Sequence, residues 1–81
     1  MQLLDGVAYQ PTTGSTAAKQ ELVIQTTLSG GTADFYVKVS DGAAFSLVTA
    51  LNDVPVTVRV PRLGSYKVEL TGSATVFADW G

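Results

Sequence analysis

Apolar and polar residues alternate with a period of two along most of the chain after Lys19. In the segment ELVIQTTL, Leu22 and Ile24 fall on one side and their neighbours on the other. Because successive side chains of a β-strand point to opposite faces, this pattern is typical of strands that cover a core with one face. The segments ADFYVKVS, AAFSLVTAL, VPVTVRVP, SYKVEL and SATVFADW show similar runs, and none has a helical period. The residues expected to face the core are Phe35, Val37, Phe45, Leu47, Val56, Val58, Val68, Leu70 and Val76.

Turn-forming residues separate these runs. The pair Asp41-Gly42 is a strong hairpin signal because both residues tolerate a positive φ, and SGG, PRLG and TGS mark further turns. Pro55 has no N–H for a strand ladder, so its strand either begins after it or lies at a sheet edge. The sequence therefore predicts an all-β domain over residues 21–81, a small antiparallel β-sandwich or barrel of about six or seven strands. Residues 1–20 are expected to form an N-terminal arm or strand and a loop.

The composition suggests a domain that associates with other chains. A chain of 81 residues buries a thin core, and the absence of cysteine and histidine removes disulfides and ordinary zinc sites as sources of extra stability. Charged residues make up 15% of the chain, against about 25% in an average soluble domain. We therefore expect self-association or a protein partner.

Two classes of partner are disfavoured. A net charge of −2 does not supply the basic field that phosphate binding needs, so no nucleic-acid partner is expected. The apolar stretches are far shorter than the ~20 residues of a membrane span, so no membrane partner is expected either.

The sequence offers little catalytic chemistry. Without histidine or cysteine, no Ser-His or Cys-His nucleophile can be built. Four aspartates lie at or near predicted turns, namely Asp34, Asp41, Asp53 and Asp79, and two of them would have to converge to act as acid and nucleophile. Aspartate is common in turns without any catalytic role, because its side chain binds nearby backbone N–H groups. The acidic residues also lack the clustering of a calcium loop. The sequence predicts no enzyme, no metal and no cofactor.

Two groups of residues are candidate partner contacts. Arg59, Arg62 and Lys67 flank one predicted hairpin turn, either as solvated side chains or as a small basic patch for an acidic surface. Tyr36 and Phe77 are expected on the outward faces of their strands. Trp80 shares the face of Val76 and is expected to cap the core or a subunit contact.

The order FYVKVSDGAAF, a valine-rich strand and LGSYKVELTGSATVFADWG resembles the small all-β structural proteins of tailed bacteriophage particles, particularly head decoration or cement proteins. The resemblance covers roughly residues 30–81. It implies a non-enzymatic virion protein, made in the host cytoplasm, that binds and stabilises the capsid lattice. The implied partners are the major capsid protein or another virion protein, with self-association as a trimer.

A second hypothesis comes from the outward aromatic residues. A carbohydrate-binding or adhesin-like module of a phage tail or cell surface would use Tyr36, Tyr66 or Trp80 as a stacking platform. Exposed aromatics beside polar groups would favour a sugar, whereas aromatics covered by another subunit would favour the structural role.

Overall fold

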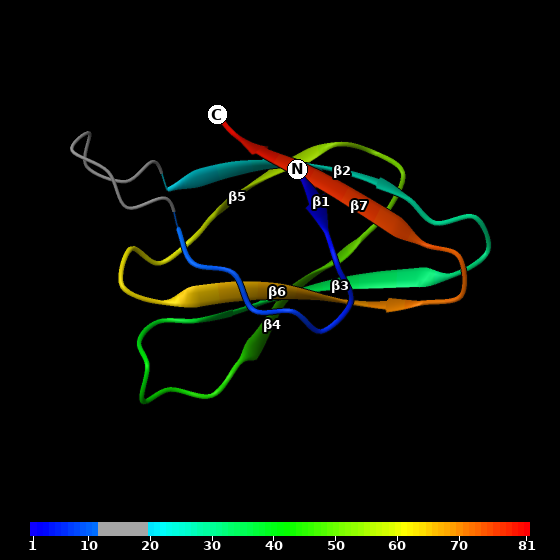
Figure 1. Cartoon of the computed structure of the whole chain (residues 1–81). Coiled ribbons are helices and arrows are strands. Elements are labelled where there is room, and N and C mark those ends of the chain that lie inside the picture. Colours follow the sequence, from blue (N-terminus) through cyan, green and yellow to red (C-terminus); the bar gives the residue numbers. More distant parts are fainter. Residues whose placement is uncertain (12–19) are drawn as a thin grey trace.

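The computed structural model describes residues 1–11 and 20–81, which form seven strands and no helix (Figure 1). The strands are β1 (Gln2–Leu3), β2 (Glu21–Thr27), β3 (Thr32–Lys38), β4 (Ser46–Leu51), β5 (Val56–Arg59), β6 (Ser65–Thr71) and β7 (Thr75–Trp80). No helix long and apolar enough to cross a membrane occurs in these ranges. The prediction of an all-β fold is confirmed.

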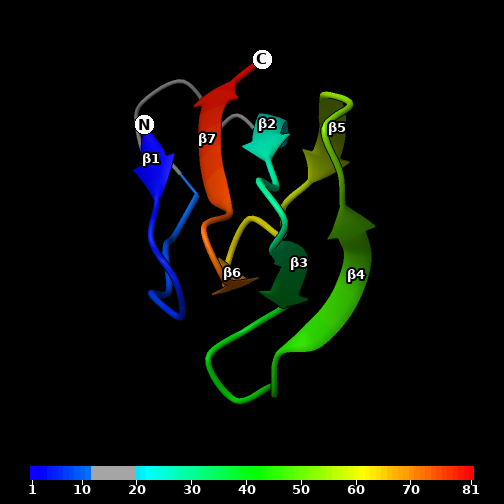
Figure 2. The same ribbon diagram turned by 90° about the vertical axis from the view of Figure 1, so that its right-hand side faces the viewer.

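The strands form two antiparallel sheets. The first has the order β1-β7-β2-β5 and the second has the order β4-β3-β6. Figure 2 shows the four-stranded sheet above the three-stranded one, with β1 at one side and β4 and β5 at the other. The sheets do not close on each other, so the arrangement is sandwich-like. β5 begins directly after Pro55 and lies at a sheet edge, as the missing proline N–H predicts.

The core lies between the two sheets and follows the alternating pattern. Phe35, Val68 and Val76 are fully buried, as predicted. Partly buried residues from the predicted core pack against them, namely Val37, Val56, Val58 and Leu70. The period of two is therefore a correct guide wherever a strand pairs regularly on both sides.

Two predicted core residues, Phe45 and Leu47, lie outside the core. The register between β3 and β4 shifts at a β-bulge, so that Thr49 lies opposite Phe35 while Leu47 lies opposite Tyr36. The extra residue reverses the alternation, and the Leu47 side chain is 57% exposed. Phe45 precedes β4, and its ring lies 4.7 Å from the Lys67 ammonium on the outer face of the three-stranded sheet.

The prediction of a hairpin around PRLG is also wrong. β5 pairs with β2 in one sheet and β6 pairs with β3 in the other, so the segment between them crosses from sheet to sheet. The residues PRLG do lie in the connection between β5 and β6, but a turn-forming sequence does not specify whether the two strands that it joins pair with each other. The strands on either side of Asp41-Gly42 do pair with each other, as predicted, but the connection between Lys38 and Ser46 is long, and neither Asp41 nor Gly42 has the positive φ expected of the turn.

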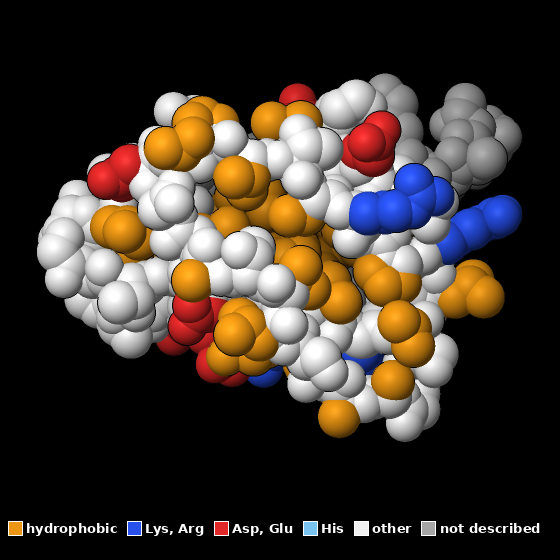
Figure 3. Space-filling model, turned by 180° about the vertical axis from the view of Figure 1, so that it is seen from behind, with side chains coloured by type: hydrophobic (Ala, Val, Ile, Leu, Met, Phe, Trp, Pro, Cys, Tyr) orange, Lys and Arg blue, Asp and Glu red, His pale blue; other side chains and the backbone are white. Residues whose placement is uncertain are grey.

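One side of the molecule, which we call the open side, is bounded by the edges of β4 and β5, which pair with no further strand within residues 1–11 and 20–81. Seen from this side, apolar side chains gather in a hollow in the middle of the face (Figure 3). Val56 and Val58 on β5 are only partly buried, although Ile24 and Leu22, their partners on β2, are fully buried. The difference arises because β5 is the last strand of its sheet and has a neighbour on one side only.

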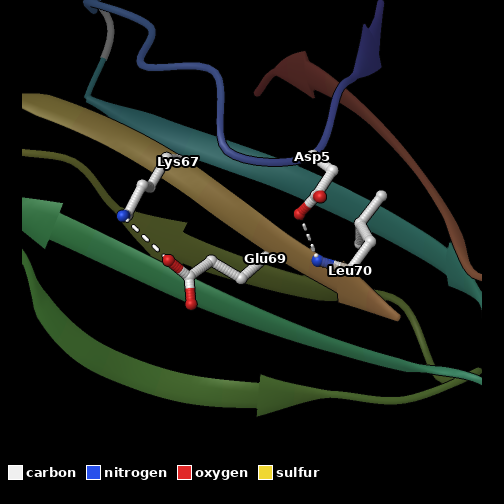
Figure 4. Close-up of polar contacts among 4 residues, drawn as sticks. All are labelled: Asp5, Lys67, Glu69 and Leu70. Atoms are coloured by element: carbon white, nitrogen blue, oxygen red, sulfur yellow. Dashed lines mark hydrogen bonds and ion pairs between the residues drawn. The ribbon is translucent and has the colours of Figure 1, made fainter.

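The opposite side is closed by the N-terminal segment, residues 1–11. β1 pairs with β7, and the Leu3 side chain is fully buried. The chain then crosses to β6, where the Gly6 N–H donates to the Val68 carbonyl and the Tyr9 N–H to the Tyr66 carbonyl, both at 2.8 Å. Figure 4 shows the Leu70 N–H donating to Asp5 Oδ1, also at 2.8 Å.

Residues 1–11 thus belong to the folded body and are no separate arm, because they contribute a core side chain and hydrogen bonds to both sheets. The expected loop over residues 12–19 lies outside the described residues.

We expect Asp5→Ala to lower the free energy of unfolding by about 1 kcal/mol, because it removes the acceptor of the Leu70 N–H at the edge of β6. Asp5→Asn keeps an oxygen at that place and should retain most of the stability. Urea denaturation of the two variants checks this. Equal losses would show that the carboxylate acts through its charge and not through this hydrogen bond.

Candidate functional site

The four aspartates considered as an acid pair are separate in the fold, and two of them bind backbone. Asp53 Oδ1 accepts from the Leu28 N–H at 3.0 Å, and Asp79 Oδ1 accepts from the Trp80 N–H at 2.8 Å. Among the described residues, no group of three or more acidic side chains is placed to hold a metal ion. The Asp53 contact is the backbone-binding role that turn aspartates commonly have, whereas Asp79 lies within β7.

The structure does not bring Arg59, Arg62 and Lys67 into one patch. Arg59 is exposed on β5, where its guanidinium donates to Gln20 Oε1 at 3.1 Å. Lys67 lies on β6 in the other sheet and faces outward there. Arg62 lies in the connection between the two strands. Because that connection crosses between the sheets, Arg59 and Lys67 are on opposite faces of the molecule.

Tyr36 and Lys67 belong to a polar network on the outer face of the three-stranded sheet. The Lys67 ammonium lies 2.9 Å from Glu69 Oε2 (Figure 4) and 5.4 Å from the Tyr36 ring. Desolvation raises the pKa of Tyr36, and the carboxylates of Glu69 and Asp34 raise it further. The phenol therefore stays protonated at neutral pH. Exposed ion pairs contribute only about 0–1 kcal/mol to the free energy of unfolding, so the Lys67–Glu69 pair adds little to the stability of the fold.

Two of the candidate stacking residues pack with the core: Tyr66 is buried, and Trp80 is partly buried against it. Tyr66 is 1% exposed. Its ring stacks on those of Tyr9 and Phe35, and Trp80 meets it edge-on with 6.0 Å between ring centroids. Trp80 shares the inward face of Val76, as predicted, and is only partly exposed. The Tyr66 ring therefore offers no free flat face for a ligand.

Phe77 is the predicted aromatic contact that is most open to solvent, and it is 50% exposed. It points away from the core, on the outer face of the four-stranded sheet. A shallow depression of about 230 Å³ next to it is lined by Met1, Val23, Gln25, Phe77, Ala78 and Asp79. We call these six residues the Phe77 face.

The Phe77 face is assembled from three neighbouring strands or their flanks. Gln25 on β2 lies directly opposite Phe77 on β7, and Gln2 on β1 lies opposite it on the other side. Met1 and Val23 add apolar surface and are 58% and 40% exposed. Sequence reasoning found Phe77 but missed Val23, although the alternation of ELVIQTTL already places this valine outward.

Searches for similar proteins return no matching family model, no matching curated protein and no matching solved structure. The functional argument therefore depends on the residues and their geometry.

Proposed function

We propose that this protein is a non-enzymatic structural module that binds a preformed protein lattice through the Phe77 face. More specifically, we propose a small β-sandwich protein of the bacteriophage virion that decorates the head, with the major capsid protein or another virion protein as its partner. The proposal requires no cofactor. The observation that carries it is a half-exposed phenylalanine beside a mostly apolar depression on the outer face of the four-stranded sheet.

An exposed phenylalanine of this kind suits protein recognition. Aromatic residues near the centre of an interface commonly supply a large share of the binding energy, surrounded by polar groups that exclude water. Gln25 and Asp79 provide such polar groups at the border of the depression. Phe77 lies on β7, which pairs with a strand on each side, so its backbone is already ordered before binding.

The test uses bacteriophage heads that lack the protein, prepared from the phage that encodes it. Adding purified protein should give saturable co-sedimentation and should raise the temperature at which the heads rupture, because a ligand of the intact state stabilises that state. Phe77→Ala should weaken binding at least about tenfold, the loss expected of a central aromatic contact.

Leu63→Ala is the matched control, because Leu63 is 80% exposed and lies outside the Phe77 face. It should bind like the wild type, and circular dichroism should show both variants folded. Heads that neither bind the protein nor gain stability would contradict the proposal. Equal binding by Phe77→Ala and the wild type would show that the protein contacts the lattice through another face.

A carbohydrate ligand is the second candidate, and one arrangement favours it. Gln2 and Gln25 flank Phe77 directly across the neighbouring strands, so that amide groups lie on both sides of a ring able to stack on a sugar. Binding of an immobilised glycan that Phe77→Ala abolishes, without binding to heads, would select this function. Tyr66, which packs in the interior, plays no part in it.

A further inference from the structure

The sheet edges of this protein differ in how they are protected against pairing with another strand. β1 is only two residues long, β5 is four residues long between Pro55 and Pro61, and β6 is covered by residues 5–9. Shortness, proline and coverage are devices that natural sheets use to block edge pairing, as are β-bulges, and the only one of these in β4 is its bulge. β4 is six residues long and contains neither proline nor a charged residue.

The β4 edge also carries exposed apolar side chains. Leu47 is 57% exposed and Val48 is 47% exposed. The bulge in β4 bends this edge locally, but it also leaves both side chains in solvent. The apolar hollow of the open side lies next to the same edge (Figure 3).

We propose that β4 pairs antiparallel with β4 of a second copy of this chain, about a two-fold axis. Such an axis places residue i of one copy opposite residue j of the other, and only the residues in the middle of β4, such as Val48, lie near their own copies, where like charges would repel. The segment SLVTAL has no charge and can therefore face itself without that cost. Pairing would join two three-stranded sheets into one of six strands.

The two-fold axis also covers the open side. If β4 joins β4, the four-stranded sheets of both copies lie on the same side of the joined sheet, and their β5 edges face each other. Val56 and Val58, half-buried in the single chain, would then lose further contact with water. Both Phe77 faces would point in the same direction. A lattice would meet two contacts at once, which increases the apparent affinity without any new contact.

The interface is tested without any lattice, so its failure is distinct from failure of the proposed function. The wild type should sediment as a dimer at tens of micromolar. Val48→Lys and Val48→Glu should each weaken self-association at least about tenfold, because each places like charges near one another at the axis. An equimolar mixture of the two variants should recover the dimer, because opposite charges then meet.

Val23→Lys is the matched control, since Val23 has similar exposure, 40%, and lies on the other sheet. It should remain dimeric, and circular dichroism of all three variants should retain the β signature. A monomeric or trimeric wild type would overturn the proposal. Full dimerisation of Val48→Lys, or a mixture no more associated than its components, would overturn it as well.

Discussion

Tyr66→Ala is expected to lower the free energy of unfolding by about 3–5 kcal/mol, the usual cost of removing a large buried aromatic ring. Tyr66 is 1% exposed and its ring contacts those of Tyr9, Phe35 and Trp80. These residues come from four separate parts of the chain, so the cavity would loosen both sheets and the N-terminal segment together. The loss is a large part of the roughly 4–12 kcal/mol that an 81-residue domain has in total.

Tyr66→Phe is the control, because it keeps the ring and removes only the hydroxyl. A hydroxyl contributes about 1 kcal/mol or less on balance, so this variant should lose far less than Tyr66→Ala. Thermal and urea unfolding measure both changes. Similar losses for the two variants would mean that the hydroxyl, and not the aromatic packing, stabilises the fold.

Gly31→Ala is expected to cost about 2–3 kcal/mol, the magnitude of overpacking a closely packed site. A Cβ at Gly31 would overlap the carbonyl oxygen of Thr71, which is backbone and cannot turn aside as a side chain does. Thr71 lies opposite Thr32 at the end of the β3–β6 ladder, and their hydroxyls are 2.6 Å apart. Relief of the overlap would therefore pull this end of the ladder apart.

Gly42→Ala is the matched control for this prediction. A Cβ there meets nothing within 4 Å, and Gly42 has no positive φ. The substitution should be neutral or stabilise by a few tenths of a kcal/mol, because alanine restricts the unfolded chain. Differential scanning calorimetry of the pair should separate them by several degrees. Equal melting temperatures would mean that the backbone around Gly31 adapts freely.

The sequence predicted the class of fold and much of its core, because alternation reports directly which side chains share a strand face. Leu22, Ile24, Val68 and Val76 are fully buried for this reason. Leu47 was misplaced because a bulge inserts one residue and leaves no sign in the apolar pattern. The pattern around it, AAFSLVTAL, reads equally well in either register.

Contacts between sheets were harder to predict than strands. Nothing in PRLG distinguishes a turn that joins paired strands from one that crosses between sheets, so Arg59 and Lys67 were expected together and lie apart. The N-terminal segment was underestimated for a related reason. Leu3 is a single buried residue in a two-residue strand, too short to produce a periodic signal, and its partner β7 is more than seventy residues away.

Of the residues that form the Phe77 face, only Phe77 itself was predicted from the sequence. Phe77 was found because it alternates with Val76 and Ala78, which face inward. Met1 and Gln25 join it through cross-strand proximity, which depends on the strand order β1-β7-β2. That order, and the closed and open sides that follow from it, required the structure.

The central claim, the proposed decoration of a bacteriophage head, is tested most directly by electron cryomicroscopy of undecorated phage heads incubated with the purified protein. The account predicts density for the two-sheet domain on the outer surface of the lattice, with Phe77 and Val23 against the capsid protein. Heads without such density would contradict the structural role, and ordered domains that contact the lattice through the Tyr36 and Lys67 face would contradict the surface proposed for it.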